Sequence, residues 1–377
     1  MAVTVTSTTE FNIDGNIYRG QAGLEALNSA GALSAVTAFG DLTTSPLKFV
    51  ATTVLVGQSV PGGIKDLVLG NVISRTGDTI TVRGAVFMKN GGAMAFNRNI
   101  SVTLGTDTLY TKQLHASAVT SQDISVGQKM LISGTISNPT ADNNYVMNVT
   151  DYAAMIVTTL LGKINTIGTS QPRLSVDLDN GNGIDLRNTG LFTFTGTGSS
   201  APFVADPNNY RIDTGTLTLG SLSSGRPFKA LGFVNSFGKS ESTDFNALTI
   251  IDLSNVKGLM NVDWGTGSAV ALSEITSSDI KLNLTDTGNF HRVYRAGAKL
   301  DLALPSVPVI IPNALGLGAF VVFGDNSLNL YLTFGSFTDA LKASIDAGSQ
   351  VRQVWAFGLY NDDSTTMTSG YIAVKLS

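Results

Sequence analysis

The sequence contains no cysteine and only two histidines in 377 residues. Without cysteine the chain has no disulfide framework, thiol nucleophile, iron–sulfur cluster or zinc ribbon. The histidines, His115 and His291, cannot complete a three-histidine metal site, and neither belongs to an HExxH helix. The absence of a GxSxG nucleophile elbow argues against a serine hydrolase. We therefore expect a protein that is not an enzyme and carries no cofactor.

Charged residues are also scarce, at 14% of the chain, and the formal net charge is −4. An average soluble protein has about 25% charged residues. A disordered chain or a coiled coil would need more charge, and nucleic-acid binding would need a basic surplus. One basic–aromatic cluster, His291–Arg295, has residue types that grip a phosphate, a sugar or a base, although such clusters more often line a strand edge. We expect no nucleic-acid partner.

Long apolar runs are few. The most apolar segment is Leu302–Phe323, and Pro305, Pro308 and Pro312 remove backbone donors from its first half. It predicts an extended segment followed by a strand over Ala319–Phe323, and no transmembrane segment. The opening residues show no basic region followed by an apolar core, so we expect no signal peptide in this chain.

Alternation with a period of two is abundant. Runs such as Thr79–Val82 and Lys281–Leu284 alternate polar and apolar residues, and Gly, Asn and Asp clusters separate such runs at short intervals. This pattern is typical of small barrels and sandwiches. Trp264 and Trp355 fall on predicted strands, where core packing is the usual fate of a tryptophan.

Helix signals are scarce. The clearest covers Phe337–Ala347, where Thr338 is a candidate N-cap and Gly348 follows the end. Its apolar residues recur at the spacing of one helix face. A second candidate covers Gln21–Ala30. We therefore expect one short helix near the C-terminus in a chain otherwise built from strands.

An internal repeat runs through the chain. Each copy holds a short strand, an internal glycine, a polar connector and a second strand that begins at or near an aromatic residue. The copies are Gly31–Val56, Val126–Tyr152, Ser224–Leu253 and Ala347–Leu376. The recurring glycines are Gly40, Gly134, Gly232 and Gly358, and the aromatic residues are Phe49, Tyr145, Phe245 and Tyr371. A lone glycine in an apolar strand marks a bulge or a tight barrel corner, so its recurrence predicts one geometry used four times.

The last three copies are each preceded by a strand–turn–strand pattern and a further strand candidate. That makes about five strands per unit, the count of a small OB-type barrel. The first copy lacks this upstream half. The sequence therefore predicts an all-β fold of tandem OB-like barrel or sandwich units. The expected boundaries are an N-terminal strand and half-unit over 1–65 and barrel units over 66–158, 159–254 and 255–377.

Short motifs carry a family resemblance over most of residues 66–377. They are Ile73–Gly84, Asp123–Gln128, Gly232–Gly238 and Ala356–Tyr360. With the repeated glycine-containing strand pairs, they resemble uncharacterised proteobacterial exported proteins and lipoproteins that carry repeated OB-like domains of unknown function. The resemblance implies an envelope or extracellular location. It supplies no catalytic residues.

One loop carries candidate metal ligands, the carboxylates of Asp177, Asp179 and Asp185. Calcium takes about six to eight oxygen ligands, and clustered Asp and Asn on a Gly-rich turn can supply them. The EF-hand register fails, because counting from Asp177 puts Asn182 where that loop needs glycine. We favour a hairpin turn rich in turn-forming residues, and we keep the three aspartates as calcium candidates.

Repeated β units without a catalytic constellation suit a scaffold. We expect a structural or adhesive protein of a cell surface or the extracellular space that self-assembles or binds another surface protein. The alternatives are a phage virion component, such as a tail, decoration or fibre protein, and a carbohydrate-binding module. The alternating segment Ala2–Phe11 predicts a strand. We expect subunits to associate through a β edge there or through Leu302–Phe323, with closure within one chain as the other outcome.

Overall fold

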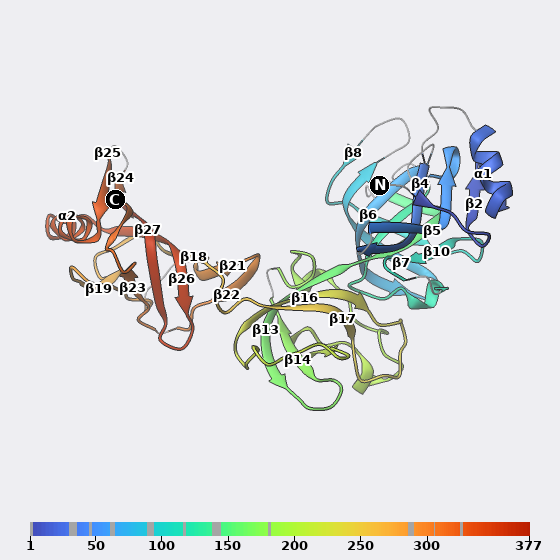
Figure 1. Ribbon diagram of the computed structural model, residues 1–377. Helices are drawn as coiled ribbons and strands as arrows, with labels where there is room; N and C mark the ends of the chain where they lie inside the picture. The colour runs from blue at the N-terminus through green and yellow to red at the C-terminus, as the bar shows by residue number, and fades with distance from the viewer. Residues whose placement is uncertain are drawn as a thin grey trace.

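The computed structural model describes residues 3–29, 36–44, 47–60, 65–88, 94–115, 118–137, 145–179, 182–285, 290–304, 306–324 and 327–377. These residues form 27 strands and two α-helices, which confirms the predicted all-β class. Four sheets follow one another along the chain, and the two termini lie in opposite end units (Figure 1). No helix in the described ranges is long and apolar enough to cross a membrane.

The first barrel spans residues 66–156. Its elements are β6 (Asp66–Thr76), β7 (Thr79–Met88), β8 (Met94–Ala95), β9 (Asn99–Thr103), β10 (Leu109–Lys112), a 3₁₀ turn (Ser121–Asp123), β11 (Lys129–Ser137) and β12 (Tyr145–Ile156). The order β6–β7–β9–β12–β11 closes on itself, because β11 pairs with β6 and β9 bridges β7 and β12. The five barrel strands in chain order are β6, β7, β9, β11 and β12. The third, β9, pairs parallel with the fifth, β12, as in OB-type barrels.

The second barrel spans residues 158–252 and has the same order. Its strands are β13 (Thr158–Ile167), β14 (Leu174–Leu178), β15 (Tyr210–Asp213), β16 (Pro227–Val234) and β17 (Phe245–Asp252). They close in the order β13–β14–β15–β17–β16, again with the third and fifth strands parallel. The long connection between β14 and β15 holds three 3₁₀ turns, Thr189–Leu191, Ala201–Phe203 and Pro207–Asn209. The fully buried rings of Tyr210, Phe228 and Phe245 fill the core.

The C-terminal unit spans residues 258–376. Its elements are β18 (Gly258–Ser268), β19 (Leu272–Ile275), β20 (Ile280–Leu282), β21 (His291–Arg295), β22 (Ala298–Asp301), β23 (Val309–Pro312), β24 (Leu317–Gly324), β25 (Ser327–Thr333), α2 (Phe334–Asp346), β26 (Val351–Asn361) and β27 (Thr366–Leu376). The last strand, β27, pairs with β26 on one side. On its other side it pairs with β23 and then with β24, and both of these pairings are parallel. Helix α2 packs Phe334 and Phe337 against Phe320 of β24.

The N-terminal unit repeats only the second half of this arrangement. Its elements are β1 (Val3–Thr4), β2 (Glu10–Ile13), β3 (Asn16–Arg19), α1 (Gly20–Ser29), β4 (Val36–Thr44), β5 (Leu47–Val56) and a 3₁₀ turn (Gly57–Ser59). As with β27, the strand β5 pairs with β4 on one side and with β1 and then β2, both parallel, on the other. Even the helix entry matches, because Gly20 N–H donates to the Thr9 carbonyl and Phe334 N–H donates to the Gly316 carbonyl, both at 2.9 Å.

Two local predictions need correction. The C-terminal helix begins three residues before Phe337, with Thr333 as its N-cap, because Thr333 has extended backbone and its hydroxyl accepts from Ser336 N–H. Thr338 lies inside the helix, where its hydroxyl donates to the Gly335 carbonyl. The weaker helix candidate forms as α1, although Ala30 lies outside the described residues.

The expected N-terminal strand over Ala2–Phe11 is also wrong as one continuous element. Ala2 lies outside the described residues, and a turn separates β1 from β2. The turn forms because Thr6 N–H donates to the Thr9 hydroxyl at 2.9 Å and Thr9 N–H donates to the Thr6 carbonyl at 3.2 Å. Both short strands pair with β5 of the same chain.

Candidate functional site

The four repeat glycines share one structural position. Each lies on the strand before the last in its unit, at a register shift against the last strand; these bulge strands are β4, β11, β16 and β26. A Cβ on Gly40, Gly232 or Gly358 would lie 1.9–2.0 Å from a carbonyl oxygen of the last strand. None of the four has a positive φ. The position therefore requires glycine because the backbones approach closely.

A second pair of glycines went unnoticed in the sequence. Gly70 of β6 and Gly162 of β13 both face the residue four places before the bulge glycine, and a Cβ on either would lie 2.1 Å from a carbonyl oxygen. The signal was present, since both follow a leucine in an apolar run of the first strand. The C-terminal unit has Val262 at this place, which weakens the pattern.

The aromatic part of the repeat alignment is wrong for Tyr371. Phe49 and Phe245 lie two residues before the residue that faces the bulge glycine, and Tyr145 lies five before it. Tyr371 lies two residues after that point, opposite Phe357. Its structural counterpart is Tyr152, which also lies two residues after the residue that faces the bulge glycine.

The bulge strand of the N-terminal unit has an exposed inner row. Four residues before the bulge glycine, Met130, Phe228 and Val354 are buried in their cores, whereas Val36 of β4 is 52% exposed. The same contrast recurs two residues after the glycine. There, Leu42 is 54% exposed, and its counterparts Ile136, Val234 and Tyr360 are buried. The residues that belong in a core therefore lie open in β4.

The missing cover is a strand. In the other three units the free side of the bulge strand pairs antiparallel with the first strand of that unit, which is β6, β13 or β18. Within the described ranges β4 pairs with β5 alone. An unpaired edge presents rows of N–H and C=O groups that another strand can satisfy. We call the free side of β4, with Val36 and Leu42, the open edge.

The opposite face of the N-terminal sheet is covered by the first barrel. The ring of Phe39 lies 5.7 Å from that of Tyr152, and Leu55 is buried although its neighbours Val54 and Val56 face the core. A cavity of about 290 Å³ between the units is lined by residues of both, including Leu55, Ser133 and Tyr152. Burial raises the pKa of Tyr152 to about 12.

The calcium candidates do not converge. Asp179 accepts from Lys299 N–H of the C-terminal unit at 2.6 Å. Asp185 accepts from the Asn71 side-chain amide of the first barrel at 2.7 Å. Asp177, whose pKa burial raises, lies on β14. Asn180 and Gly181 lie outside the described residues. The residues that the structure does describe contain no group of three or more His, Asp or Glu side chains that could hold a metal ion. The loop instead holds the second barrel to both of its neighbours.

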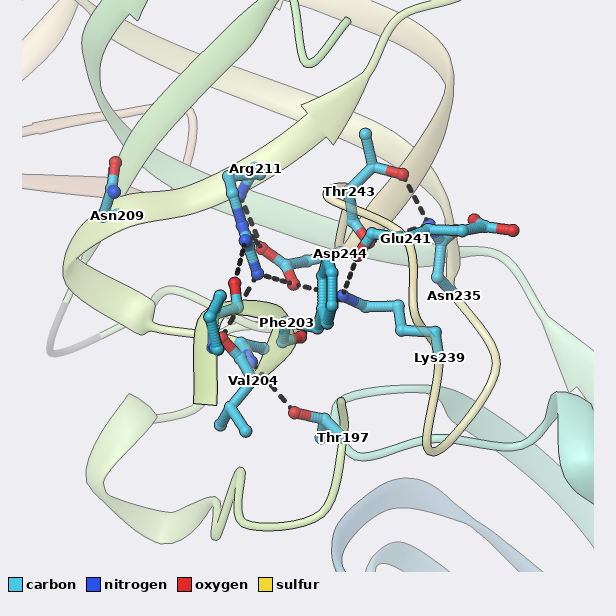
Figure 2. A network of polar contacts seen from close by, with 12 residues as sticks. Thr197, Phe203, Val204, Asn209, Arg211, Asn235, Lys239, Glu241, Thr243 and Asp244 are labelled. Atoms are coloured by element: carbon cyan, nitrogen blue, oxygen red, sulfur yellow. Dashed lines mark hydrogen bonds and ion pairs between the residues drawn. The ribbon is translucent and has the colours of Figure 1, made fainter. Parts of the chain in front are cut away.

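The second barrel contains a buried ionic network around Asp244 (Figure 2). Its carboxylate accepts from Arg211 Nε and Nη2, each at 2.9 Å, and lies 2.9 Å from Lys239 Nζ. Arg211 also donates to the Val204 carbonyl, and Lys239 donates to the Phe203 carbonyl. Because these donors are used on loop carbonyls, the network fastens the 3₁₀ turn Ala201–Phe203 to the barrel wall.

The basic–aromatic cluster on β21 is occupied by internal contacts. Arg292 Nε donates to Asp301 at 2.8 Å. Arg295 is fully buried, and its guanidinium donates to Asp362 at 2.9 Å and to the Tyr360 carbonyl at 2.7 Å. Asp362 also pairs with Arg226 of the second barrel at 3.3 Å. The cluster therefore joins two units and does not present both arginines to a ligand.

The two histidines lie in different units. His115 packs on the ring of Phe233, and burial, with Lys112 nearby, lowers its pKa. His291 lies on β21 of the C-terminal unit. Trp264 is buried in the core and donates to the Asn283 carbonyl, as expected. Trp355 was expected in a core as well, but it stands on the outer face of its sheet, because the core residues Val354 and Ala356 flank it.

No family model matches this chain, and a search of curated proteins returns no match.

Proposed function

We propose that this protein is a non-enzymatic structural protein of a cell surface or the extracellular space, and that it assembles through the open edge of β4. The observation that carries the proposal is the exposure of Val36 and Leu42 at positions that are buried in the other three units. Covering them removes apolar surface from water, at about 25 cal/mol per Å² of apolar surface. A strand added to β4 also satisfies its unpaired backbone groups.

The partner strand that we propose is β4 of a second copy. In each complete unit the strand that covers the bulge strand runs antiparallel to it. A two-fold axis makes β4 antiparallel to its own copy, so that one surface serves both subunits. The inner rows of the two β4 strands then lie side by side on the same face of a continuous sheet. No partner other than a second copy of this chain is needed to form this contact.

Low charge and repeated β units support the structural role and the location. Charged residues make up 14% of the chain, and an uncharged polar surface suits a protein that packs against its own copies outside the cell. Arg226 of the second barrel pairs with Asp362 and Asp363 of the C-terminal unit, so these charges fasten one unit to the next. The resemblance to exported proteins with repeated OB-like domains favours the same location.

The test compares the mass of the wild-type chain with that of a double variant, Val36→Lys and Leu42→Lys, by light scattering over a range of concentrations. Both side chains are half exposed in the single chain, so lysine is tolerated there. On pairing, the same positions become buried, and an unpaired buried charge is costly. We expect the wild-type chain to gain mass with concentration through this edge and the double variant to lose that association.

The matched control is the pair Leu248→Lys and Ile251→Lys on β17. These residues are also partly exposed and apolar, but they lie away from the open edge. The control should keep the wild-type mass. A wild-type chain that remains a monomer at every concentration, or a double variant that associates as the wild type does, would overturn the proposed function.

A further inference from the structure

The outer face of the C-terminal unit is largely apolar and aromatic, with Lys375 and Gln353 at one end of it. Phe323 and Trp355 stack with ring centroids 5.9 Å apart, and Phe357 contacts Tyr371 at 6.4 Å. Strand pairing continues this face onto β25, because Leu330 lies opposite Val321 and Leu328 lies opposite Phe323. We call this surface the aromatic face; its members are Phe323, Leu328, Leu330, Leu332, Trp355, Phe357 and Tyr371.

The chain itself shows what covers this face elsewhere. Phe357 and Phe39 each directly precede a bulge glycine. Tyr371 and Tyr152 each lie opposite the residue that directly precedes the bulge glycine of their own unit. Phe39 and Tyr152 meet where the N-terminal unit packs on the first barrel. There, the outer face of one unit covers the corresponding outer face of another.

Among the residues that the structure describes, none gives the aromatic face such a cover. Tyr152 is 4% exposed, whereas its counterpart Tyr371 is 62% exposed and Phe357 is 44% exposed. The three leucines of β25 are exposed as well. A contiguous apolar patch of this kind marks an interaction site. The covered pair of faces identifies the matching surface as another outer face of the same fold.

We propose that the aromatic face binds the aromatic face of a second copy about a two-fold axis. In this contact Phe357 of each copy lies against Tyr371 of the other, which repeats the contact of Phe39 with Tyr152. A two-fold axis makes such a surface complementary to itself, since each copy supplies both members of the pair. Aromatic pairs of this kind gain from packing and from ring geometry together.

This inference rests on the proposed function only in that both contacts join copies of the same chain, and it uses different residues. The N-terminal and C-terminal units lie at opposite ends of the molecule (Figure 1). Pairing through β4 at one end and through the aromatic face at the other links copies into an open chain. Along such a chain of copies, contacts through β4 alternate with contacts through the aromatic face.

Sedimentation velocity on four proteins at one concentration tests this inference. They are the wild type, the edge variant (Val36→Lys with Leu42→Lys), the face variant (Phe357→Lys with Tyr371→Lys) and the combined variant. We expect assemblies larger than dimers for the wild type, dimers for each double variant and monomers for the combined variant. Circular dichroism checks that each variant is folded.

The outcomes separate the two contacts. An edge variant that is monomeric overturns the aromatic-face contact and leaves the open edge standing. A face variant that is monomeric overturns the open edge and leaves the aromatic-face contact standing. As a second test, Phe357→Leu and Tyr371→Phe in the edge variant keep the surface apolar, and we expect them to retain the dimer. Loss of the dimer on Leu248→Lys with Ile251→Lys would contradict a contact specific to the aromatic face.

Discussion

Val36 and Val354 occupy the same place in two units of one chain, four residues before a bulge glycine, yet Val36 is 52% exposed and Val354 is 1% exposed. The difference has one cause in the topology. Val354 lies opposite Val262 of β18, the first strand of its unit, and no described residue takes the corresponding place beside β4. The exposed valine is therefore a core residue whose core is unfinished.

Truncating these two valines should have unequal effects on the free energy of unfolding of the monomeric chain. Val354→Ala leaves a gap in a filled core and should lower the free energy of unfolding of its unit by about 1–3 kcal/mol. Val36→Ala should change that of the N-terminal unit by less than about 0.5 kcal/mol. Tryptophan fluorescence reports the C-terminal unit, because both tryptophans lie in it, and hydrogen exchange of β5 reports the N-terminal unit. Equal losses would contradict the unfinished core.

Replacing a bulge glycine should be costly. In Gly358→Val the new Cβ would lie 1.9 Å from the Thr368 carbonyl oxygen, so the hairpin must shift. We expect the free energy of unfolding of the C-terminal unit to fall by about 1–3 kcal/mol. Denaturant unfolding monitored by tryptophan fluorescence measures this loss. The matched control is Gly335→Ala in α2, where a Cβ meets nothing within 4 Å. That change should stabilise the helix by up to about 1 kcal/mol, and a tolerated Gly358→Val would refute the close approach.

Alkaline pH should loosen the contact between the N-terminal unit and the first barrel. Burial raises the pKa of Tyr152 to about 12, while the unfolded chain ionises near its ordinary value of about 10. The stabilising contribution is therefore complete below pH 10 and is lost as the pH rises toward 12, by about 1.4 kcal/mol per pH unit. Tyr152→Phe should flatten the fall in thermal stability over that range, measured by circular dichroism. An unchanged pH profile would show that the phenol is not buried between the units.

Calcium should not bind the loop that carries Asp177, Asp179 and Asp185. Asp179 and Asp185 accept hydrogen bonds from the two neighbouring units, so these carboxylates are already engaged. Titration calorimetry with calcium should show no stoichiometric heat. Asp185→Asn should instead weaken the link to the first barrel. A micromolar, stoichiometric heat that Asp177→Ala and Asp179→Ala abolish would restore the calcium site.

The all-β class was visible in the sequence because strands alternate polar and apolar residues. The recurring glycines were visible because a close backbone approach excludes every side chain larger than hydrogen. Gly232 and Gly358 stand out in apolar strands for that reason. The register across strands is not visible in this way. The connector between the two strands differs in length from unit to unit: Gly134 faces Thr150, whereas Gly358 faces Ser369. Tyr371 therefore aligns in space with Tyr152 and not with Tyr145.

The role of each exposed surface could not be predicted from the sequence either. Alternation predicts which residues of a strand share a face, but it does not say whether another unit covers that face. Leu55 and Ala373 follow the same pattern, and only Leu55 is buried, because the first barrel lies over it. The hydrogen bonds of Asp179 and Asp185 depend likewise on where neighbouring units lie.

Concentration-dependent hydrogen exchange of β4 tests the central claim most directly. The reference is β26, whose two sides are paired within the chain. If β4 pairs with a second copy, the β4 amides should exchange more slowly as the concentration rises, while exchange in β26 stays constant. In Val36→Lys with Leu42→Lys that slowing should vanish. Exchange in β4 that is independent of concentration, in a protein whose mass rises over the same range, would contradict assembly through this edge.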